Sequence, residues 1–302
     1  MLNFELIRVA VALVATGIAA WQDGRTSFID DKILWAMIAI GALLNLATLD
    51  LDFILFSIGG AAIIGAIGYY GYKTGQLGAG DVMLFAGLQL LLPFPAIETA
   101  TMLGLLPQAG TYMQTAYLGI AQAFPFFVSF FIATSLLMLV GSSLLYAHRL
   151  WKNGQLVVRG KQLYLATGLG IAAIAFLYWF STAYSLHLIQ LALFVAVLAS
   201  SLFTIAFKEK ITESLVQQLT ISQIEDEDIL AIEQLDPVLV KKYSIEKVLT
   251  KENVEKLKKI EKSEGRHTFP VYKNLPRMGP YAFIGLVASI ALISPIAFIL
   301  FI

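Results

Sequence analysis

Long apolar segments are the feature that most restricts how this chain can fold. A membrane-spanning helix needs about 20 apolar residues to cross about 30 Å of hydrocarbon, and eight segments approach or reach that length. Lipid offers no hydrogen-bond partners to a backbone, and these runs do not alternate as barrel strands do, so helices are expected. The sequence therefore predicts an all-α polytopic membrane helix bundle of about eight spans. The segments are Phe4–Trp21, Ile33–Leu49, Phe53–Tyr72, Asp81–Phe94, Phe124–Ala147, Leu163–Phe180, Tyr184–Phe207 and Pro280–Ile302.

The distribution of charge divides the chain into regions. Of its 302 residues 58% are hydrophobic and 14% charged, and 13 of the 21 basic and 13 of the 21 acidic residues lie between Lys208 and Arg277. We therefore expect a membrane domain at 1–207, a soluble helical insert at 208–278 and a C-terminal transmembrane helix at 279–302. Because the charge of the insert is balanced, nucleic acid is not an expected partner.

Three local patterns predict helix starts inside the insert. Asp236 before Pro237 is a cap followed by a first-turn proline, and Thr250 can cap the apolar stretch that follows it. The acidic run 225–228 also suits the start of a solvated helix. Within the membrane domain, Asn45 is expected to hydrogen-bond between helices.

The orientation of the spans follows from the basic residues, because loops rich in Lys and Arg stay in the cytoplasm. With the N-terminus outside, 20 of the 21 basic residues fall on the inner side, and Arg8 is the exception. The sequence therefore predicts a multi-pass protein of the cell membrane, in contact with lipid, whose two termini are outside and whose insert is cytoplasmic.

Two aspartates lie at the predicted cytoplasmic ends of apolar segments, where burial of a carboxylate is costly enough to indicate a function. Asp23 follows the first segment after Gln22, and Asp81 opens the fourth segment. The fourth segment reaches Pro93 after about 12 residues, or about 18 Å of helix, which is too short to span a bilayer. Gly78 and Gly80 give the backbone before Asp81 the freedom to unwind and to approach another chain closely.

Two carboxylates held together in a low-dielectric site share one proton. The ionised group can then take a proton from a water that attacks a peptide carbonyl, while the protonated group stabilises the developing oxyanion. This chemistry requires no metal and no cofactor, and none is expected. The chain has no cysteine and only three histidines, so cysteine nucleophiles and Cys-ligated metal sites are excluded.

The residues around both aspartates resemble a known family. Gly78-Ala79-Gly80-Asp81 is similar to the G-x-G-D signature of the type IV prepilin peptidases, and the stretch 23–31 resembles the loop that carries their first catalytic aspartate. The archaeal preflagellin (prearchaellin) peptidases are the branch that it resembles most. The resemblance implies an aspartic-type endopeptidase of the type IV pilus or archaellum pathway, with Asp23 and Asp81 as its catalytic pair.

The same resemblance implies the substrate. The family removes a short basic class III signal peptide, which ends in a small residue before the hydrophobic pilin helix. Partners would be prepilin or prearchaellin proteins, cleaved at the cytoplasmic face of the membrane, and Asp30 and Asp31 would favour the basic leader. The chain departs from the family in the extra hydrophobic hairpin of 163–207. It also has Met83 where many members have lysine, and it lacks the cysteine-rich domain of bacterial relatives.

Two alternatives remain open. One is an intramembrane protease resembling presenilin or signal peptide peptidase, which pair G-x-G-D with Tyr-Asp and Pro-Ala-Leu motifs. Here Gln22 precedes Asp23, and the late proline stands in Leu275-Pro276-Arg277. The other is a transporter in which the aspartates bind protons or cations. Placement of both acids at one face, instead of the membrane midplane, disfavours it.

Overall fold

The computed structural model describes residues 4–94, 125–157, 161–183, 188–225, 227–273 and 275–292. Residues 95–124 and the end of the last predicted span, 293–302, are outside the described part of the chain. The chain divides into two compact units. Residues 1–66, 80–207 and 277–302 form the helical unit, and residues 67–79 and 208–276 form the insert unit.

Helices dominate the structure, and the predicted fold class, an all-α membrane helix bundle, is confirmed. Among the described residues, five helices (α1, α3, α7, α8 and α9) are long and apolar enough to cross a membrane, whereas α4 and α13 are shorter. The bounds are α1 Phe4–Thr26, α2 Asp31–Leu46, α3 Leu51–Lys73, α4 Ala79–Leu91, α7 Phe126–Lys152, α8 Lys161–Ala183, α9 Leu188–Ala206 and α13 Met278–Ala291.

The first helix is longer than its apolar run. It continues past Trp21 to Thr26, so Asp23 lies in the last turn of α1 and not in the loop after it. The Thr26 hydroxyl donates to the Gln22 carbonyl at 2.9 Å, and the Ser27 amide donates to the Asp23 carbonyl at 2.9 Å. Ser27 then adopts a φ of 59° and ends the helix. Local hydrogen bonds thus extend α1 beyond the point at which its hydrophobicity falls.

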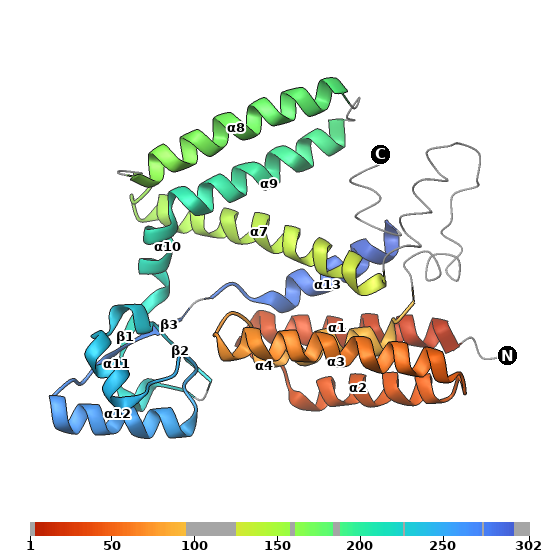
Figure 1. Cartoon of the computed structure of the whole chain (residues 1–302), viewed down its shortest axis with the longest axis horizontal. Coiled ribbons are helices and arrows are strands. Elements are labelled where there is room, and N and C mark those ends of the chain that lie inside the picture. The colour runs from red at the N-terminus through yellow and green to blue at the C-terminus, as the bar shows by residue number, and fades with distance from the viewer. Residues whose placement is uncertain are drawn as a thin grey trace. The chain divides into compact units, whose positions relative to one another are not determined.

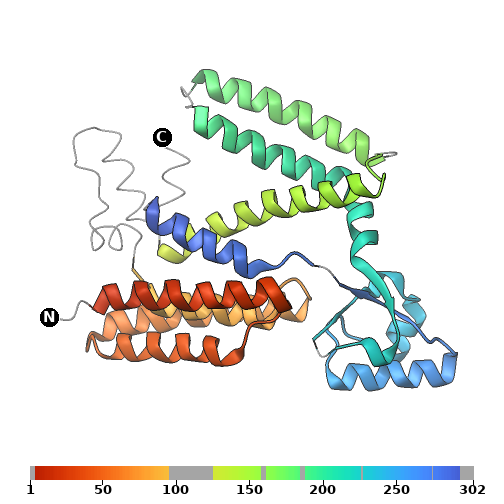
Figure 2. The ribbon, with the colours of Figure 1, turned by 180° about the vertical axis from the view of Figure 1, so that it is seen from behind.

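Packing in the helical unit places α13 between α1 and α7 (Figures 1 and 2). The hairpin of α8 and α9 is attached to α7 through α9. There the Ser143 hydroxyl of α7 lies 3.3 Å from the Ser200 carbonyl and 3.2 Å from the Thr204 hydroxyl. Such interhelical polar contacts and small residues are the usual means of association between apolar helices.

The short helix α4 packs closely against its neighbours because glycines leave room for it. A Cβ at Gly41 of α2 would lie 2.8 Å from the Leu90 side chain, and one at Gly60 of α3 would lie 2.8 Å from Gln89. On α4 itself, a Cβ at Gly87 would lie 3.2 Å from Met37. Three glycines therefore allow three helix backbones to approach one another.

Arg8, the exception to the predicted charge asymmetry, is buried at 1% exposure. Its Nη1 donates to Asn45 Oδ1 at 2.6 Å and to the carbonyls of Leu90 and Leu91 at 3.3 and 3.5 Å. Asn45 in turn donates to the Leu90 carbonyl at 3.0 Å and to the Ser57 hydroxyl. The predicted interhelical role of Asn45 is confirmed, and Arg8 satisfies the carbonyls that the end of α4 leaves open.

The insert unit combines helices with a small antiparallel sheet of order β1-β3-β2. Val216 pairs with Tyr272 on one side of β3, and Leu230 pairs with Val271 on the other. Only the helices of this unit were expected from the sequence. The described elements are α10 Lys208–Leu215, β1 Val216–Leu219, 3₁₀ turns at Ile221–Gln223 and Ile232–Gln234, β2 Ile229–Leu230, α11 Pro237–Tyr243, α12 Lys251–Glu264 and β3 Phe269–Tyr272.

The predicted helix caps of the insert are confirmed. The Val238 amide donates to Asp236 Oδ1 at 2.8 Å, and the Asn253 amide donates to the Thr250 hydroxyl at 3.5 Å. The prediction of a helix start in the acidic run 225–228 is wrong, because Glu225, Glu227 and Asp228 lie outside any helix, and Lys273 pairs with two of these acids. The Lys273 ammonium lies 2.7 Å from Asp228 and 3.1 Å from Glu225. Burial acts to lower the pKa of Lys273, but these carboxylates outweigh it and raise that pKa.

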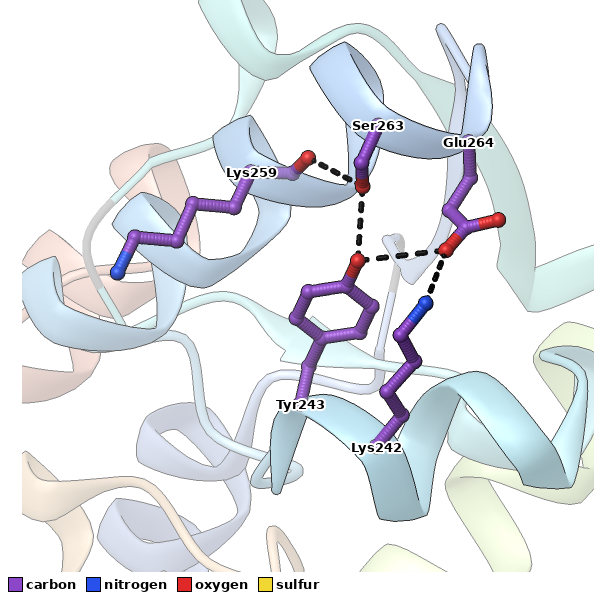
Figure 3. Close-up of polar contacts among 5 residues, drawn as sticks. All are labelled: Lys242, Tyr243, Lys259, Ser263 and Glu264. Atoms are coloured by element: carbon purple, nitrogen blue, oxygen red, sulfur yellow. Dashed lines mark hydrogen bonds and ion pairs between the residues drawn. The ribbon is translucent and has the colours of Figure 1, made fainter.

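A polar cluster joins the ends of α11 and α12 (Figure 3). The Lys242 ammonium and the Tyr243 hydroxyl lie 2.7 and 3.3 Å from one carboxylate oxygen of Glu264. The Tyr243 hydroxyl also lies 2.7 Å from the Ser263 hydroxyl, which bonds to the Lys259 carbonyl at 2.8 Å. Beneath this exposed cluster, Leu257, Ile260 and Phe269 belong to the buried core of the insert.

Candidate functional site

Asp23 is a buried acid whose carboxylate has a defined partner. Asp23 lies in the last turn of α1, and the residue is 8% exposed. Oδ2 accepts a hydrogen bond of 2.7 Å from the backbone amide of Gly279, in the first turn of α13. A carboxylate removed from water needs such a donor, since an unpaired buried charge is strongly destabilising. The fold thus orients the Asp23 carboxylate.

Asp81 lies in the first turn of α4, and its side chain is partly buried. Ala79 begins the helix, so Gly78 stands directly before it and Gly80 inside its first turn. A Cβ at Gly80 would lie 3.7 Å from both Ile29 and Leu34, which follow the end of α1. The start of α4 therefore packs against the α1–α2 connection.

Contacts at both ends of α4 place the two aspartates at the same end of the helical unit. Arg8, near the start of α1, bonds to Leu90 at the end of α4. Gly80, at the start of α4, lies beside Ile29, just after the end of α1. The two helices consequently run in opposite directions. Asp23 ends one of them and Asp81 begins the other, as the sequence analysis expected.

The other two acids predicted near the site have different environments. Asp30 is the N-cap of α2, where its Oδ1 accepts from the Lys32 amide at 3.0 Å. Its own amide donates to Gln22 Oε1 at 2.9 Å, which ties the connection back to α1. Asp31 is exposed in the first turn of α2. Asp30 therefore has a structural task in shaping the connection, whereas the Asp31 carboxylate faces solvent.

Two residues at this end of the helical unit were not foreseen from the sequence. Gly279 donates to Asp23, and the exposed Arg277 guanidinium donates to the carbonyl of Gly24. The sequence feature that could have indicated this role of Gly279 is its position between Met278 and Pro280 at the start of an apolar helix. Its importance depends on a partner 256 residues earlier in the chain, so local pattern alone did not reveal it.

The turn that leads to Asp81 packs within the insert unit. Gly75 has a φ of 66°, and a Cβ there would lie 3.2 Å from Ile229 and 3.3 Å from Lys247. The Tyr72 hydroxyl lies 3.4 Å from Glu227 Oε1. The residues just before the Gly78-Ala79-Gly80-Asp81 motif are therefore held by the insert's own strand and loops.

Comparison with known proteins identifies a family for the segment that carries both aspartates. Residues 10–141 match the model of the type IV leader peptidase family, which is a stretch of fewer than half of the chain's residues. The predicted resemblance to the prepilin peptidase family is confirmed. The α8–α9 hairpin, the insert and α13 lie outside the matched residues.

A curated relative agrees with this match. The chain is 33% identical over 110 residues to prepilin peptidase EppA of the archaeon Methanothermobacter thermautotrophicus (strain Delta H). The alignment covers 34% of this chain and 28% of the relative, so the similarity extends over about a quarter of that protein's length. No solved structure matches the chain.

Proposed function

Because the segment that holds Asp23 and Asp81 matches the type IV leader peptidase family, we propose that this chain is a membrane aspartic endopeptidase that cleaves leader peptides from prepilin-like proteins. The observation that carries the proposal is the placement of both aspartates at one end of the helical unit, with Asp23 buried and its carboxylate oriented. Burial of an acid at the end of an apolar helix is costly enough to indicate a function.

The mechanism follows from two carboxylates that share one proton. The ionised carboxylate takes a proton from a water molecule as the water oxygen attacks the scissile carbonyl. The protonated carboxylate donates a hydrogen bond to the carbonyl oxygen as that oxygen becomes negative. Collapse of the tetrahedral intermediate breaks the C–N bond, and a proton passes to the leaving amine. All groups required for these steps are supplied by the dyad and water.

The proposed substrate has a short basic leader, a small residue before the scissile bond and a hydrophobic helix. With the N-terminus outside, the dyad faces the cytoplasm, where such a leader remains while the pilin helix stays in the bilayer. The exposed Asp31 carboxylate and its neighbour Asp30 would attract the leader, although exposed charges contribute at most about 1 kcal/mol. Prepilins and prearchaellins both fit this description.

Substitution of each aspartate tests the proposal. Asp23→Asn and Asp81→Asn keep the side-chain shape but remove a titratable group, so each should lower cleavage of a coexpressed leader-bearing pilin by about 10²–10⁴-fold. Mass spectrometry of the pilin N-terminus measures the cleavage. Asp52→Asn, an exposed acid in the first turn of α3, is the matched control and should cleave normally. Unchanged cleavage by either dyad variant would refute the proposal and would favour a role in transport.

A further inference from the structure

The start of α13 makes a close backbone contact with the end of α1. The Gly279 amide donates to Asp23 Oδ2 at 2.7 Å, and Arg277, the N-cap of α13, donates to the Gly24 carbonyl. A Cβ at Gly24 would lie 3.8 Å from the ring of Pro280. Three residues at the start of α13 thus lie against the last turn of α1: Arg277, Gly279 and Pro280.

Only glycine allows this approach. A Cβ at position 279 would lie 2.9 Å from both Cβ and Oδ2 of Asp23, and 3.1 Å from the Cα of Ala20. Real Cβ atoms do not approach other heavy atoms to 2.9 Å, and the Ala20 backbone cannot give way without moving α1. Any side chain at position 279 must therefore displace either the Asp23 carboxylate or the start of α13.

The bond also suits the charge of its acceptor. The first amides of a helix have no partners within the helix and carry the positive end of its dipole. Asp23 supplies a carboxylate from another helix to one of these amides, and the bond occupies Oδ2. A bond of 2.7 Å from a backbone amide restricts rotation of the carboxylate and leaves Oδ1 as its other oxygen.

We propose that Gly279, assisted by Arg277, is a positioning residue that sets the orientation of the Asp23 carboxylate for peptide hydrolysis. The inference rests on the proposed function of Asp23. It extends the site to α13, beyond the residues that match the family. Gly279 acts through Asp23 and does not contact the peptide, so its loss changes the rate of the chemical step and not substrate affinity.

The first measurement is independent of catalysis. Full-length protein in membranes is treated with a water-soluble carbodiimide and an amine, and coupling at Asp23 is measured by mass spectrometry. Gly279→Ala should increase the rate of coupling at Asp23 at least severalfold, because the added methyl displaces a carboxylate that is now buried. Gly59→Ala is the neutral control, since a Cβ there meets nothing within 4 Å among the described residues.

The second measurement is cleavage of a leader-bearing pilin. Gly279→Ala should lower kcat on the order of 100-fold and leave KM unchanged, as expected for misplacement of a reacting group. Gly285→Ala is the structural control, because its Cβ would contact Thr134 of α7 and loosen the same helix away from Asp23. Equal effects of the two variants on kcat and on coupling would show that helix packing is responsible, and would overturn the inference.

Arg277 provides an independent test if Gly279→Ala is not recovered in membranes. Its side chain is exposed, so Arg277→Ala should insert normally, raise coupling at Asp23 and lower kcat severalfold. Arg277→Lys, which retains a donor for the Gly24 carbonyl, should restore most of the activity. Wild-type behaviour of Arg277→Ala in both measurements contradicts the inference.

The two proposals fail in different ways. If the wild-type protein cleaves no leader-bearing pilin, the proposed function is wrong, and coupling at Asp23 still reports whether Gly279 positions that carboxylate. If the wild-type protein cleaves and Asp23→Asn does not, then normal coupling and kcat in Gly279→Ala reject the positioning role alone.

Discussion

Single polar residues inside the helical unit have a clear physical purpose. Arg8 is 1% exposed and bonds to Asn45 and to the last carbonyls of α4, while its guanidinium lies 5.7 and 5.6 Å from the ring centroids of Phe53 and Phe94. These contacts replace part of the hydration that the cation has lost, and Nη2 has no hydrogen-bond partner among the described residues. At the other end of α1, the buried Asp23 carboxylate accepts a hydrogen bond from the Gly279 backbone amide for the same reason. Each buried charge thus connects α1 to another helix.

Removal of Arg8 should destabilise the protein. Arg8→Ala leaves Asn45 Oδ1 and the Leu91 carbonyl short of a donor, which costs about 1–3 kcal/mol. The melting temperature in detergent should fall accordingly. Arg25→Ala is the control, because Arg25 is exposed and stacks on Trp21 with a guanidinium-to-ring distance of 4.5 Å. A melting temperature no lower than that of the control would contradict this account of Arg8.

At the scale of elements, the turn between α3 and α4 connects the insert unit to the motif of Asp81. Its Gly75 has a positive φ and little space beside Ile229 and Lys247. Gly78 and Gly80 were expected from the sequence to be important, and Gly75 was not. A single sequence does not show which glycine of a glycine-rich turn has the left-handed backbone, since that depends on the packing of the turn.

Gly75→Ala should therefore impair cleavage. Alanine at a φ of 66° is strained by about 1–2 kcal/mol, and its Cβ must also push Ile229 or Lys247 aside. We expect cleavage to fall severalfold. Gly154→Ala provides a matched control, because Gly154 has a φ of 65° but nothing within 4 Å of its Cβ position among the described residues. Equal activities in the two variants would show that the packing of Gly75 has no role.

The contact between α11 and α12 should depend on pH. The hydrogen bond and charge of Lys242 hold the pKa of Glu264 below its usual value, and Glu264 in turn raises the pKa of Lys242. A lowered pKa in the folded state means that Glu264 stabilises the fold above its unfolded pKa, about 4.3. This stabilisation is lost as the pH falls through the lowered pKa.

Hydrogen exchange of the full-length protein measures the effect. After correction for the intrinsic pH dependence of exchange, the amides of α11 should lose protection as the pH falls below about 4. The change should be small, because the pair is exposed to solvent. Glu264→Gln should show weaker protection at neutral pH and no further loss on acidification. Glu246 is exposed and lies outside the cluster, so Glu246→Gln should behave as the wild type. If Glu264→Gln and the wild type showed the same pH dependence of exchange, the dependence of this contact on Glu264 ionisation would be excluded.

The whole molecule combines a membrane helix bundle with an α/β insert unit. The family match ends at residue 141, within α7, and α9 adds the hairpin to that helix through Ser143, Ser200 and Thr204. α13 then returns to α1 and completes the surroundings of Asp23. Segments beyond the matched region thus contribute to the same helical unit as the two aspartates.

The orientation of the molecule can be tested directly because the chain has no cysteine. Single cysteines introduced at Asp52 and Asn153 lie at the start of α3 and just after α7, respectively. With the N-terminus outside, a membrane-impermeant maleimide added to intact cells should label the cysteine at 52 and not the one at 153. Labelling at 153 would report the opposite orientation and would place Asp23 and Asp81 away from the cytoplasmic face.

The sequence by itself determined the membrane class, the main helices, the caps of the insert and the resemblance to the type IV leader peptidase family, and it singled out the two aspartates. These properties depend on hydrophobicity, charge and spacing over short stretches of chain. Tertiary structure alone decided the antiparallel sheet, the ion pair of Lys273 with Asp228, the conformation of Gly75 and the bond from Gly279 to Asp23. Each of these depends on the approach of backbones far apart in the chain, and for Asp23 the separation is 256 residues. A local sequence pattern does not predict such a contact, because the space beside a residue depends on the distant segment that packs against it.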